Sequence, residues 1–310
     1  MTNKFKYLKN QTILVTGGTG SIGSYLVKQI LKNQPKLVKI YARGEYKHFQ
    51  LIQELAQKFE KDKFKNVIGD VRNSQRLNQA CQNVDIIFHT AGLKHISFCN
   101  QNPQEAIATN ITGAQNLIQA AVNNNVKKVF AISTDKAVEP TTTMGATKFV
   151  MERLFLKALD INPRSKTLFS VVRFGNIINS KGSVLPLWQK QIQNNQPITV
   201  TDKEMKRYFM TIPKAVNGIL SIVEYMQGKE IFVLKMEEIS IYELAQETIN
   251  KYSPEKQVKI KIIGRRGHEK TQEKLFNPVE KKFIYEKDLC YIILPDRKTY
   301  LERRDKYEKV

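Results

Sequence analysis

The chain has 310 residues, 41% of them hydrophobic, and a formal net charge of +21 from 50 basic and 29 acidic side chains. That length suits one large domain or two closely packed ones, and the apolar fraction excludes a disordered chain. No stretch approaches the roughly 18 consecutive apolar residues of a membrane span, and the first residues lack the apolar core of a signal peptide. We therefore expect a cytoplasmic protein without a membrane partner.

The positive charge alone does not indicate a nucleic-acid partner. The sequence has no run of five or more lysines or arginines and no zinc-finger or RNA-recognition signature. The three cysteines, Cys81, Cys99 and Cys290, are too few and scattered for a disulfide framework, and the four histidines lack metal-ligand spacing. We expect no nucleic acid and no metal, and leave binding of an anionic small molecule open.

Short apolar runs alternate with amphipathic stretches through the first half of the chain. Strands are predicted at 12–16, 37–41, 67–68, 84–89, 129–133 and 169–173, and helices at 21–31, 49–59, 106–121 and 145–158. Such alternation is typical of a doubly wound parallel sheet covered by helices on both faces. We therefore predict an α/β protein with a Rossmann fold.

Beyond about residue 178 this alternation breaks down. Helices are predicted at 183–194, 212–227, 239–251 and 296–307, and strands at 198–201, 231–234 and 258–263. We assign residues 1–178 to a nucleotide-binding domain and residues 179–310 to a smaller C-terminal α/β portion that binds the substrate. Whether the chain returns to the first domain is left open. The cleft is expected at the carboxyl ends of the strands.

A glycine-rich turn, TGGTGSIG at residues 16–23, joins the first strand to the first helix. In such a fingerprint the glycines permit a tight turn, close approach of a pyrophosphate and close packing of the helix, whose N-terminus offers free N–H groups. The turn predicts a dinucleotide site, against the alternative of a glycine-rich turn without a ligand. The predicted binding residues are Gly17, Thr19, Gly20, Ser21, Ile22 and Gly23.

The end of the second strand bears on the choice between NAD and NADP. An NAD enzyme normally places a carboxylate there for the ribose 2′-hydroxyl, whereas this chain has Arg43 and then Lys47, which suit a 2′-phosphate. This favours NADP, and Glu45 keeps NAD as the alternative. Asp70 and Val71 follow the third strand, where the aspartate is either a partner of the adenine amino group or a solvated turn residue.

These features, with the run STDK at 133–136 and a lysine at 148, resemble the extended short-chain dehydrogenase/reductase family. The match is closer to its UDP-N-acetylglucosamine 4,6-dehydratase branch, which includes capsule- and flagellin-sugar enzymes. The segments that carry it, in family order up to about residue 270, are ILVTGGTGSIG (13–23), GDVR (69–72), AGLKH (91–95), STDKA (133–137), MGATK (144–148), RFGN (173–176), GSVLP (182–186) and PITVTD (197–202). Together they are highly specific, whereas the glycine motif alone is not.

The resemblance implies a reaction that is redox-neutral overall. Hydride leaves C-4 of the hexosamine for NADP, water is lost across C-5 and C-6, and the hydride returns to C-6. By resemblance, Asp135 is the acid that expels the 6-hydroxyl and Lys136 is the base at C-5. Outside this motif, a surface ion pair would be the simpler interpretation of the two residues. Thr134 takes the hydroxyl position of the family triad, and Lys148 takes the lysine position at the nicotinamide ribose.

Met144 stands where the family pattern Tyr-x-x-x-Lys has its tyrosine. A thioether cannot deprotonate the 4-hydroxyl, but active members of this branch with methionine here are known, so the residue strengthens the branch assignment. The sequence does not decide which group deprotonates the 4-hydroxyl. The candidates are Thr134, Asp135, Lys136 and a water held by Lys148.

The resemblance also assigns further ligand contacts. Ala91, Lys94 and Asn110 are expected at the cofactor, and Gly44, where relatives usually have aspartate, fits NADP. The residues expected at the UDP-sugar are Lys94, Asn176, Ser183, Val184, Pro186, Thr199, Arg207, Arg265 and Glu269. The run RRGHEK at 265–270 is one residue longer than the family's Arg-x-Gly-Glu-Lys, so the choice between Arg265 and Arg266 as the phosphate contact is open.

We therefore expect NADP-dependent 4,6-dehydration of UDP-N-acetylglucosamine to a UDP-4-keto-6-deoxy-hexosamine for surface polysaccharide or glycoprotein sugars, with inversion at C-5 undecided. A homo-oligomer, either a dimer or a hexamer, is expected. The alternatives are a UDP-hexose 4-epimerase on the same scaffold, which would normally keep the tyrosine that Met144 replaces, and a non-catalytic NADP-binding protein.

Overall fold

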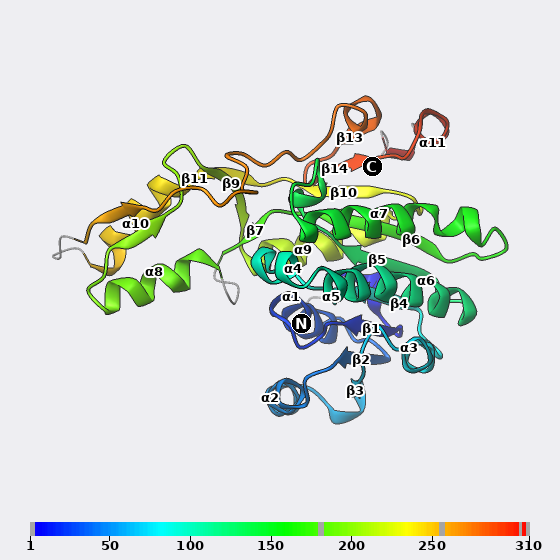
Figure 1. Ribbon diagram of the computed structural model, residues 1–310. Helices are drawn as coiled ribbons and strands as arrows, with labels where there is room; N and C mark the ends of the chain where they lie inside the picture. The colour runs from blue at the N-terminus through cyan, green and yellow to red at the C-terminus, as the bar shows by residue number, and fades with distance from the viewer. Residues whose placement is uncertain (1–3, 179–182, 254–257, 304–305, 308–310) are drawn as a thin grey trace.

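The computed structural model describes residues 4–178, 183–253, 258–303 and 306–307, and its centre is a nine-stranded sheet (Figure 1). The strand order is β13-β14-β10-β6-β5-β4-β1-β2-β3, and the strands from β10 to β3 run parallel. The strands of this sheet are β1 (Thr12–Thr16), β2 (Leu37–Ala42), β3 (Phe64–Ile68), β4 (Ile86–His89), β5 (Lys128–Ile132), β6 (Leu168–Arg173), β10 (Ile231–Leu234), β13 (Ile284–Glu286) and β14 (Cys290–Ile293). The strands follow one another outward in opposite directions from the neighbouring pair β1 and β4, and doubly wound sheets bind ligands at such a switch point. The predicted fold class is confirmed.

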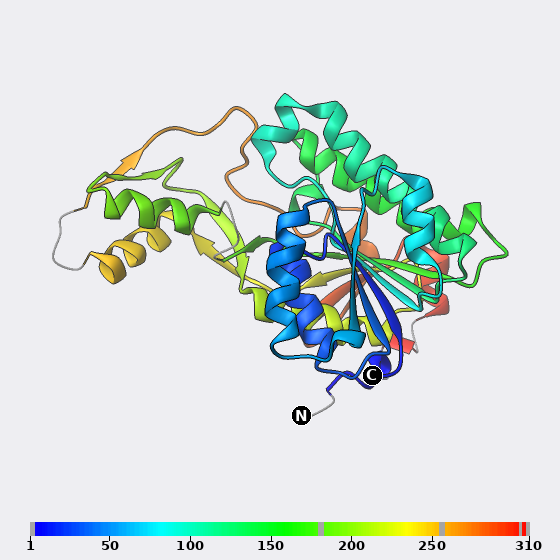
Figure 2. The same cartoon turned by 90° about the horizontal axis from the view of Figure 1, so that it is seen from below.

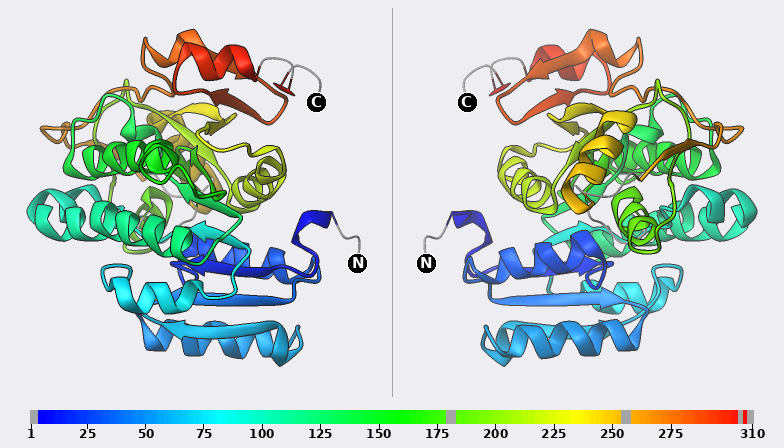
Figure 3. Two further views of the ribbon diagram at one scale, coloured as in Figure 1. Left: turned by 90° about the vertical axis from the view of Figure 1, so that its right-hand side faces the viewer. Right: turned by 90° about the vertical axis from the view of Figure 1, so that its left-hand side faces the viewer.

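Helices cover both faces of the main sheet (Figure 3). The helices are α1 (Ser21–Leu31), α2 (Glu45–Ala56), α3 (Ser74–Cys81), α4 (Ile96–Gln101), α5 (Pro103–Ile107), α6 (Gly113–Asn123), α7 (Thr143–Ile161), α8 (Val184–Gln193), α9 (Ile212–Ile222), α10 (Ile241–Tyr252) and α11 (Arg297–Glu302). Leu26 of α1 and Val216 of α9 belong to one buried cluster, and Leu77 of α3 and Phe155 of α7 belong to another. Each of these amphipathic helices therefore buries its apolar side against one face of the sheet.

After β6 the chain forms a smaller lobe beside the main sheet (Figures 1 and 2). In this lobe β7 (Asn176–Ile177), β9 (Lys206–Met210) and β11 (Glu237–Ser240) form a three-stranded sheet, and β8 (Ile198–Val200) pairs in parallel with β12 (Ile260–Ile262). Trp188 of α8 is fully buried among side chains of this lobe, and its indole N–H donates to the carbonyl oxygen of Thr199 at 2.7 Å. The lobe therefore has a small core of its own.

The chain returns to the main sheet twice beyond residue 178. β10 has the sequence IFVL with all four residues buried, and it pairs in parallel with β6. β14 and β13 then extend the edge in antiparallel pairing. Such a short, fully apolar run is typical of an interior strand of a parallel sheet. The C-terminal portion, residues 179–310, is thus divided between the small lobe and the main sheet.

Several elements differ from the sequence-based prediction. The helix expected at 106–121 consists of α5 and α6 joined by a π-helical turn, η3 (Ala108–Thr112). α2 begins at Glu45, four residues before the expected start at 49. The helix expected at 296–307 is observed as α11, while residues 304–305, like Gly182 of the GSVLP motif, lie outside the described residues. Among the described residues, no helix combines the length and apolar content needed to cross a bilayer.

Candidate active site

The glycine-rich turn lies between the carboxyl end of β1 and the N-terminus of α1. Gly17 has a φ of +68°, and a Cβ there would lie 2.7 Å from the backbone nitrogen of Ala91. A Cβ at Gly23 would lie 2.3 Å from the carbonyl oxygen of Gly17. Both positions therefore require glycine. Among the described residues no side chain caps α1, so its first N–H groups keep their capacity to bind an anion. The other predicted residues of the turn, all partly or fully exposed, are Thr19, Gly20, Ser21 and Ile22.

An ion-pair cluster surrounds the end of β2. The side chain of Arg43 is 55% exposed, and its guanidinium lies 3.6 Å from a carboxylate oxygen of Asp70. Asp70 also accepts hydrogen bonds from the backbone N–H and the guanidinium of Arg72, at 2.9 and 2.7 Å. Burial alone would raise the pKa of Asp70, but the hydrogen bonds from Arg72 bring it below its usual value. Lys47 lies in the first turn of α2, and Val71 is buried in the core. Arg72 was not among the predicted residues, although it ends the GDVR segment.

The π-helical turn η3 fixes the loop that follows β4. Asn110 accepts a hydrogen bond from the backbone N–H of Leu93 at 2.8 Å and donates to the Leu93 carbonyl oxygen and to the Thr147 hydroxyl. Its amide therefore ties the loop after β4 to α7, and π-helical turns are frequent at functional sites. Lys94 follows in the same loop, and burial lowers the pKa of its ammonium. Both Asn110 and Lys94 were expected at the cofactor.

The predicted acid–base pair lies directly after β5 and is buried. Asp135 is fully buried, and the side chain of Lys136 is 15% exposed, so the pair is not a surface ion pair. One carboxylate oxygen of Asp135 accepts hydrogen bonds from the Thr134 hydroxyl at 2.8 Å and from the Lys136 ammonium at 3.0 Å. The same ammonium donates to the side-chain oxygen of Asn176 at 3.1 Å. The second carboxylate oxygen of Asp135 has no hydrogen-bond partner among the described residues.

Helix α7 brings Lys148 and Met144 to the same place. The Lys148 ammonium donates to the carbonyl oxygen of Ile132, the last residue of β5, at 2.9 Å. Burial lowers the pKa of Lys148 to about 8, partly opposed by Glu152. A Cβ at Gly92 would lie 3.1 Å from the Lys148 nitrogen, so the lysine faces the loop after β4, which also contacts the glycine-rich turn. The structure therefore brings the glycine-rich turn, the loop after β4 and the predicted catalytic residues together at the carboxyl ends of β1, β4 and β5, while Arg43, Lys47, Asp70 and Val71 follow the ends of β2 and β3.

Met144 lies in a small apolar cluster. Its side chain is 3% exposed and packs with Cys99 and Ala106, with Leu93 and Ile96 at the edge of the cluster. The position of the family's tyrosine is therefore occupied by a buried thioether, which cannot act as a base.

The residues expected at the UDP-sugar lie mainly in the small lobe. Arg207 of β9 is 6% exposed, and its guanidinium donates to the carbonyl oxygens of Lys206, Lys270 and Thr271 at 2.7 to 3.0 Å. Glu269 is 3.9 Å from the same guanidinium. These contacts hold the backbone after β12 against β9. The side chain therefore has an internal role whether or not it also contacts a phosphate.

The other predicted sugar contacts of the lobe differ in how far their polar groups are already paired. Thr199 is hydrogen-bonded to Gln191 through both its backbone N–H and its hydroxyl. Arg265 is 53% exposed and pairs with Asp202 at 3.1 Å. Ser183 precedes α8, and its buried hydroxyl has no hydrogen-bond partner among the described residues. Within the first turn of α8 lie Val184 and Pro186.

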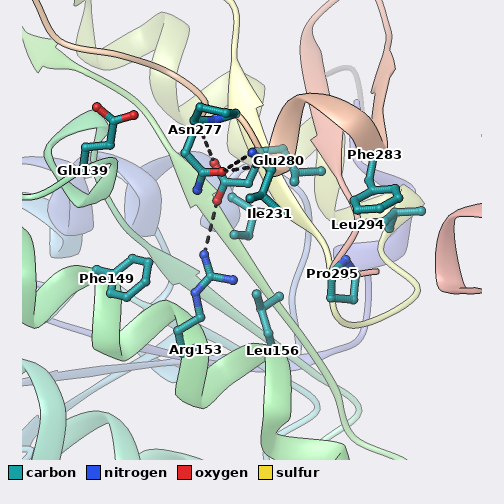
Figure 4. Close-up of a pocket in the computed structure, with 13 residues that line it drawn as sticks. Glu139, Phe149, Arg153, Leu156, Ile231, Asn277, Glu280, Phe283, Leu294 and Pro295 are labelled. Carbon is teal, nitrogen blue, oxygen red and sulfur yellow. Dashed lines mark hydrogen bonds and ion pairs between the residues drawn. The ribbon is translucent and has the colours of Figure 1, made fainter. Parts of the chain in front are cut away.

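A cavity of about 420 Å³ lies apart from these residues, between α7, β10, β14 and the turn η6 (Glu280–Phe283) (Figure 4). Phe149, Arg153 and Asn277 line it, and the Arg153 guanidinium points toward the Glu280 carboxylate at 3.3 Å. None of the predicted site residues lines this cavity. It is therefore not the site that the motifs describe.

Comparison with known proteins agrees with the motif-based expectation. The family model described as polysaccharide biosynthesis protein matches residues 13–295. An uncharacterized membrane protein of Methanocaldococcus jannaschii is 43% identical, over 93% of this chain and 87% of the relative. A UDP-N-acetylglucosamine 4,6-dehydratase (inverting) of Campylobacter jejuni is 39% identical, over 95% of this chain and 86% of the relative. A UDP-glucose 4-epimerase of Rickettsia bellii is also 39% identical, over 87% and 79%.

A solved structure supports the same grouping. The X-ray structure of Pen from Bacillus thuringiensis superposes with a TM-score of 0.89 at 40% identity, covering 93% of this chain and 90% of that one. Because the family model spans nearly the whole chain and the dehydratase relative covers most of it, the resemblance found in the sequence is confirmed. This chain belongs to the polysaccharide biosynthesis protein family, in the branch that contains the UDP-N-acetylglucosamine 4,6-dehydratases.

Proposed function

We propose that this protein catalyses the NADP-dependent 4,6-dehydration of UDP-N-acetylglucosamine to a UDP-4-keto-6-deoxy-hexosamine. The observation that carries the proposal is the hydrogen-bonded array of Thr134, the buried Asp135 and the mostly buried Lys136, with Lys148 bonded to the end of the preceding strand. A dehydratase of this kind needs an acid at the 6-hydroxyl and a base at C-5, and the array supplies one candidate for each. The dehydratase relative from Campylobacter jejuni supports the assignment of substrate.

The residues at the switch point fit a nicotinamide dinucleotide. Gly17 and Gly23 leave no room for side chains beneath a pyrophosphate, and the N-terminus of α1 has no side-chain cap. Lys148 has three N–H donors, and its described bonds go to the Ile132 carbonyl oxygen and, more weakly, the Met151 sulfur, which leaves a donor for a ribose hydroxyl. When bound, the dinucleotide accepts the hydride from C-4 and returns it to C-6.

The chain's own residues would then carry the proton transfers. Asp135, once protonated, donates to the departing 6-hydroxyl, and its unpartnered carboxylate oxygen is the atom available to carry that proton. Lys136, in its neutral amine form, takes the C-5 proton that the 4-ketone makes acidic, and so returns to the ammonium that pairs with Asp135 and Asn176. The Lys148 ammonium orients the ribose and keeps the local potential positive.

The proton of the 4-hydroxyl requires an acceptor other than Met144. Among the candidates, Thr134 already donates its hydroxyl hydrogen to Asp135 at 2.8 Å. This contact makes the threonine and the aspartate a connected route for that proton. Lys136 and a water held by Lys148 remain the other candidates, and substitutions at position 134 distinguish them from this route.

For the cofactor we propose NADP rather than NAD. Arg43 is more than half exposed at the end of β2, and Lys47 lies in the first turn of α2. Two cations after the second strand support a contact with a ribose 2′-phosphate. For the assembly we propose a homo-oligomer, dimer or hexamer, as in the resembling branch.

A UDP-hexose 4-epimerase is the second candidate function, because a relative that is 39% identical has such a name. Incubation with UDP-N-acetylglucosamine and NADP, followed by mass spectrometry, separates the candidates. Dehydration gives a product lighter by one water, epimerisation gives a product of equal mass, and a non-catalytic binding protein gives none. An unchanged mass with full cofactor occupancy would refute the dehydratase. Proton NMR of the product made in deuterated water reports whether C-5 is inverted.

A further inference from the structure

The segment between β12 and η6, residues 263–279, connects the small lobe to the main sheet (Figure 2). Side chains hold it at several points along its length. Arg207 binds the carbonyl oxygens of Lys270 and Thr271, and the Lys270 ammonium donates to the carbonyl oxygen of Val138 at 2.8 Å. The Thr141 hydroxyl donates to the His268 carbonyl oxygen at 2.9 Å. The segment is therefore fixed both to the lobe and to the loop that follows Lys136.

This arrangement brings a further carboxylate to the acid–base pair. The side chain of Glu273 is 6% exposed, and one of its oxygens lies 3.7 Å from the Lys136 ammonium. The Lys270 ammonium lies 3.6 Å from the other oxygen, which has no hydrogen-bond partner among the described residues. A carboxylate this deeply buried costs free energy unless opposite charges surround it, and here two ammonium groups do so.

We propose that Glu273 is a positioning residue for Lys136, an inference that rests on the proposed dehydration. Lys136 has an acceptor on Asp135, one on Asn176 and the charge of Glu273 close by. Asp135 cannot neutralise the ammonium while it is itself the protonated acid. Glu273 keeps its charge through that stage and stabilises the ammonium that forms when Lys136 takes the C-5 proton. A carboxylate behind the base plays the same part in the serine-protease triad.

The charged groups around Lys136 define what the substitution changes. The negative charges described beside its ammonium are Asp135 and Glu273, and the Lys270 ammonium lies 3.6 Å from Glu273. Removing the charge of Glu273 leaves one negative charge fewer beside the ammonium. The ammonium that forms when Lys136 takes the C-5 proton is then less stabilised, so this proton transfer is slower.

The test compares Glu273→Gln with Glu273→Asp and with Lys274→Gln, in the full-length protein with NADP. Lys274 is the adjacent residue and pairs with Glu139 at 2.8 Å on the surface, with the lysine 60% exposed, so it is a matched control that should behave like the wild type. For Glu273→Gln we expect kcat to fall by about tenfold or more with little change in KM, as for an interaction made in the transition state. Glu273→Asp, which keeps the charge, should recover part of the rate.

A second readout separates positioning from folding. Oxidation at C-4 precedes proton removal at C-5, so Glu273→Gln should still develop the absorbance of reduced nicotinamide on mixing with substrate, and its NADP affinity should stay near the wild-type value. Unchanged kcat, or parallel loss of C-4 oxidation and cofactor binding, would overturn the inference. If the wild type itself releases no dehydrated product, the proposed function fails. If the wild type and Glu273→Gln dehydrate equally, only the role of Glu273 fails.

Discussion

Replacing Arg173 with methionine tests the energetics of a buried charge cluster that supports α7. Arg173 of β6 is fully buried and donates two hydrogen bonds to Glu152 of α7, at 2.8 and 2.7 Å. It donates two more to Glu280 at the start of η6, at 2.9 and 2.8 Å. Glu152 lies one turn beyond Lys148, so the cluster connects the helix of the active-site lysine to the main sheet and to the C-terminal segment.

The expected loss follows from the two carboxylates that Arg173→Met leaves without their guanidinium. Removing one partner of a buried ion pair costs about 3–5 kcal/mol. At roughly 2 °C per kcal/mol for a domain of this size, the melting temperature should fall by about 6–10 °C at neutral pH. The matched control is Lys157→Met, which removes an exposed pair with Asp160 at 3.0 Å and should cost less than about 0.5 kcal/mol.

Acidification gives the same experiment a second, independent outcome. Burial would raise the pKa of Glu280, but the hydrogen bonds from Arg173 bring it below its ordinary 4.5. In the wild type this stabilisation is complete above that ordinary value and is lost as the pH falls through the lower folded-state pKa. In Arg173→Met, Glu280 loses the hydrogen bonds that oppose burial most strongly and keeps only those from the Asn277 backbone and the pair with Arg153. Its pKa therefore rises relative to the wild type, and protonation relieves part of the loss in the variant. Chemical denaturation at several pH values should show that the difference in unfolding free energy between the wild type and Arg173→Met becomes smaller as the pH falls. The reasoning would be refuted by a melting temperature of Arg173→Met within about 2 °C of wild type, or by a difference in unfolding free energy that grows as the pH falls.

Three further substitutions address the active site itself. Lys136→Ala should abolish dehydration while NADP affinity, measured by fluorescence titration, stays within about twofold; lost cofactor binding would contradict its role as base. Arg43→Ala should weaken NADP binding about tenfold or more and NAD binding less, since a charge-assisted contact contributes about 1.5–3 kcal/mol; equal losses would exclude a 2′-phosphate contact. Lys148→Met should remove activity, yet it should raise the unfolding free energy at neutral pH by about 1–3 kcal/mol. Burial lowers the pKa of Lys148 to about 8, so the folded state holds this proton less well than the unfolded chain does. Urea denaturation checks this, and a less stable Lys148→Met protein would be the contrary result.

The main sheet was predictable because its strands carry the local signals of interior parallel strands. β10, with the sequence IFVL, is buried at every residue, and β1 is buried throughout as well. In the small lobe, β8 and β12 were also predicted, but β9 and β11 give no such signal. β11 has the sequence EEIS, and β9 begins with two basic residues, so both look like surface loop in isolation. They form strands because they pair antiparallel with each other, with Ile239 opposite Arg207, and pairing between distant segments is not visible in a local pattern.

In the candidate site, too, residues in local motifs were predicted from the sequence, whereas residues defined by long-range contacts were not. The glycine-rich turn and the Thr134–Lys136 run are short motifs whose geometry follows from a strand that ends and a helix or turn that begins, and the sequence placed them correctly at strand ends. Arg72 and Glu273 were not predicted, because they are recognised only by their contacts in the folded chain and not by a local motif. Arg72 holds Asp70, and Glu273 reaches Lys136 only because a distant segment is laid across the loop after β5.

Arg207 combines an expected contact with the substrate's diphosphate and an observed structural role. A guanidinium has five N–H donors, and three hydrogen bonds of Arg207 hold backbone carbonyls at Lys206, Lys270 and Thr271. The remaining donors suffice for a phosphate oxygen, so the internal bonds do not preclude the expected diphosphate contact. If that contact forms, it involves the same side chain that fixes the segment carrying Glu273. Binding of the substrate's diphosphate and placement of Lys136 would then depend on one guanidinium, so truncation of Arg207 should impair both substrate affinity and turnover, whereas loss of Glu273 should impair turnover alone.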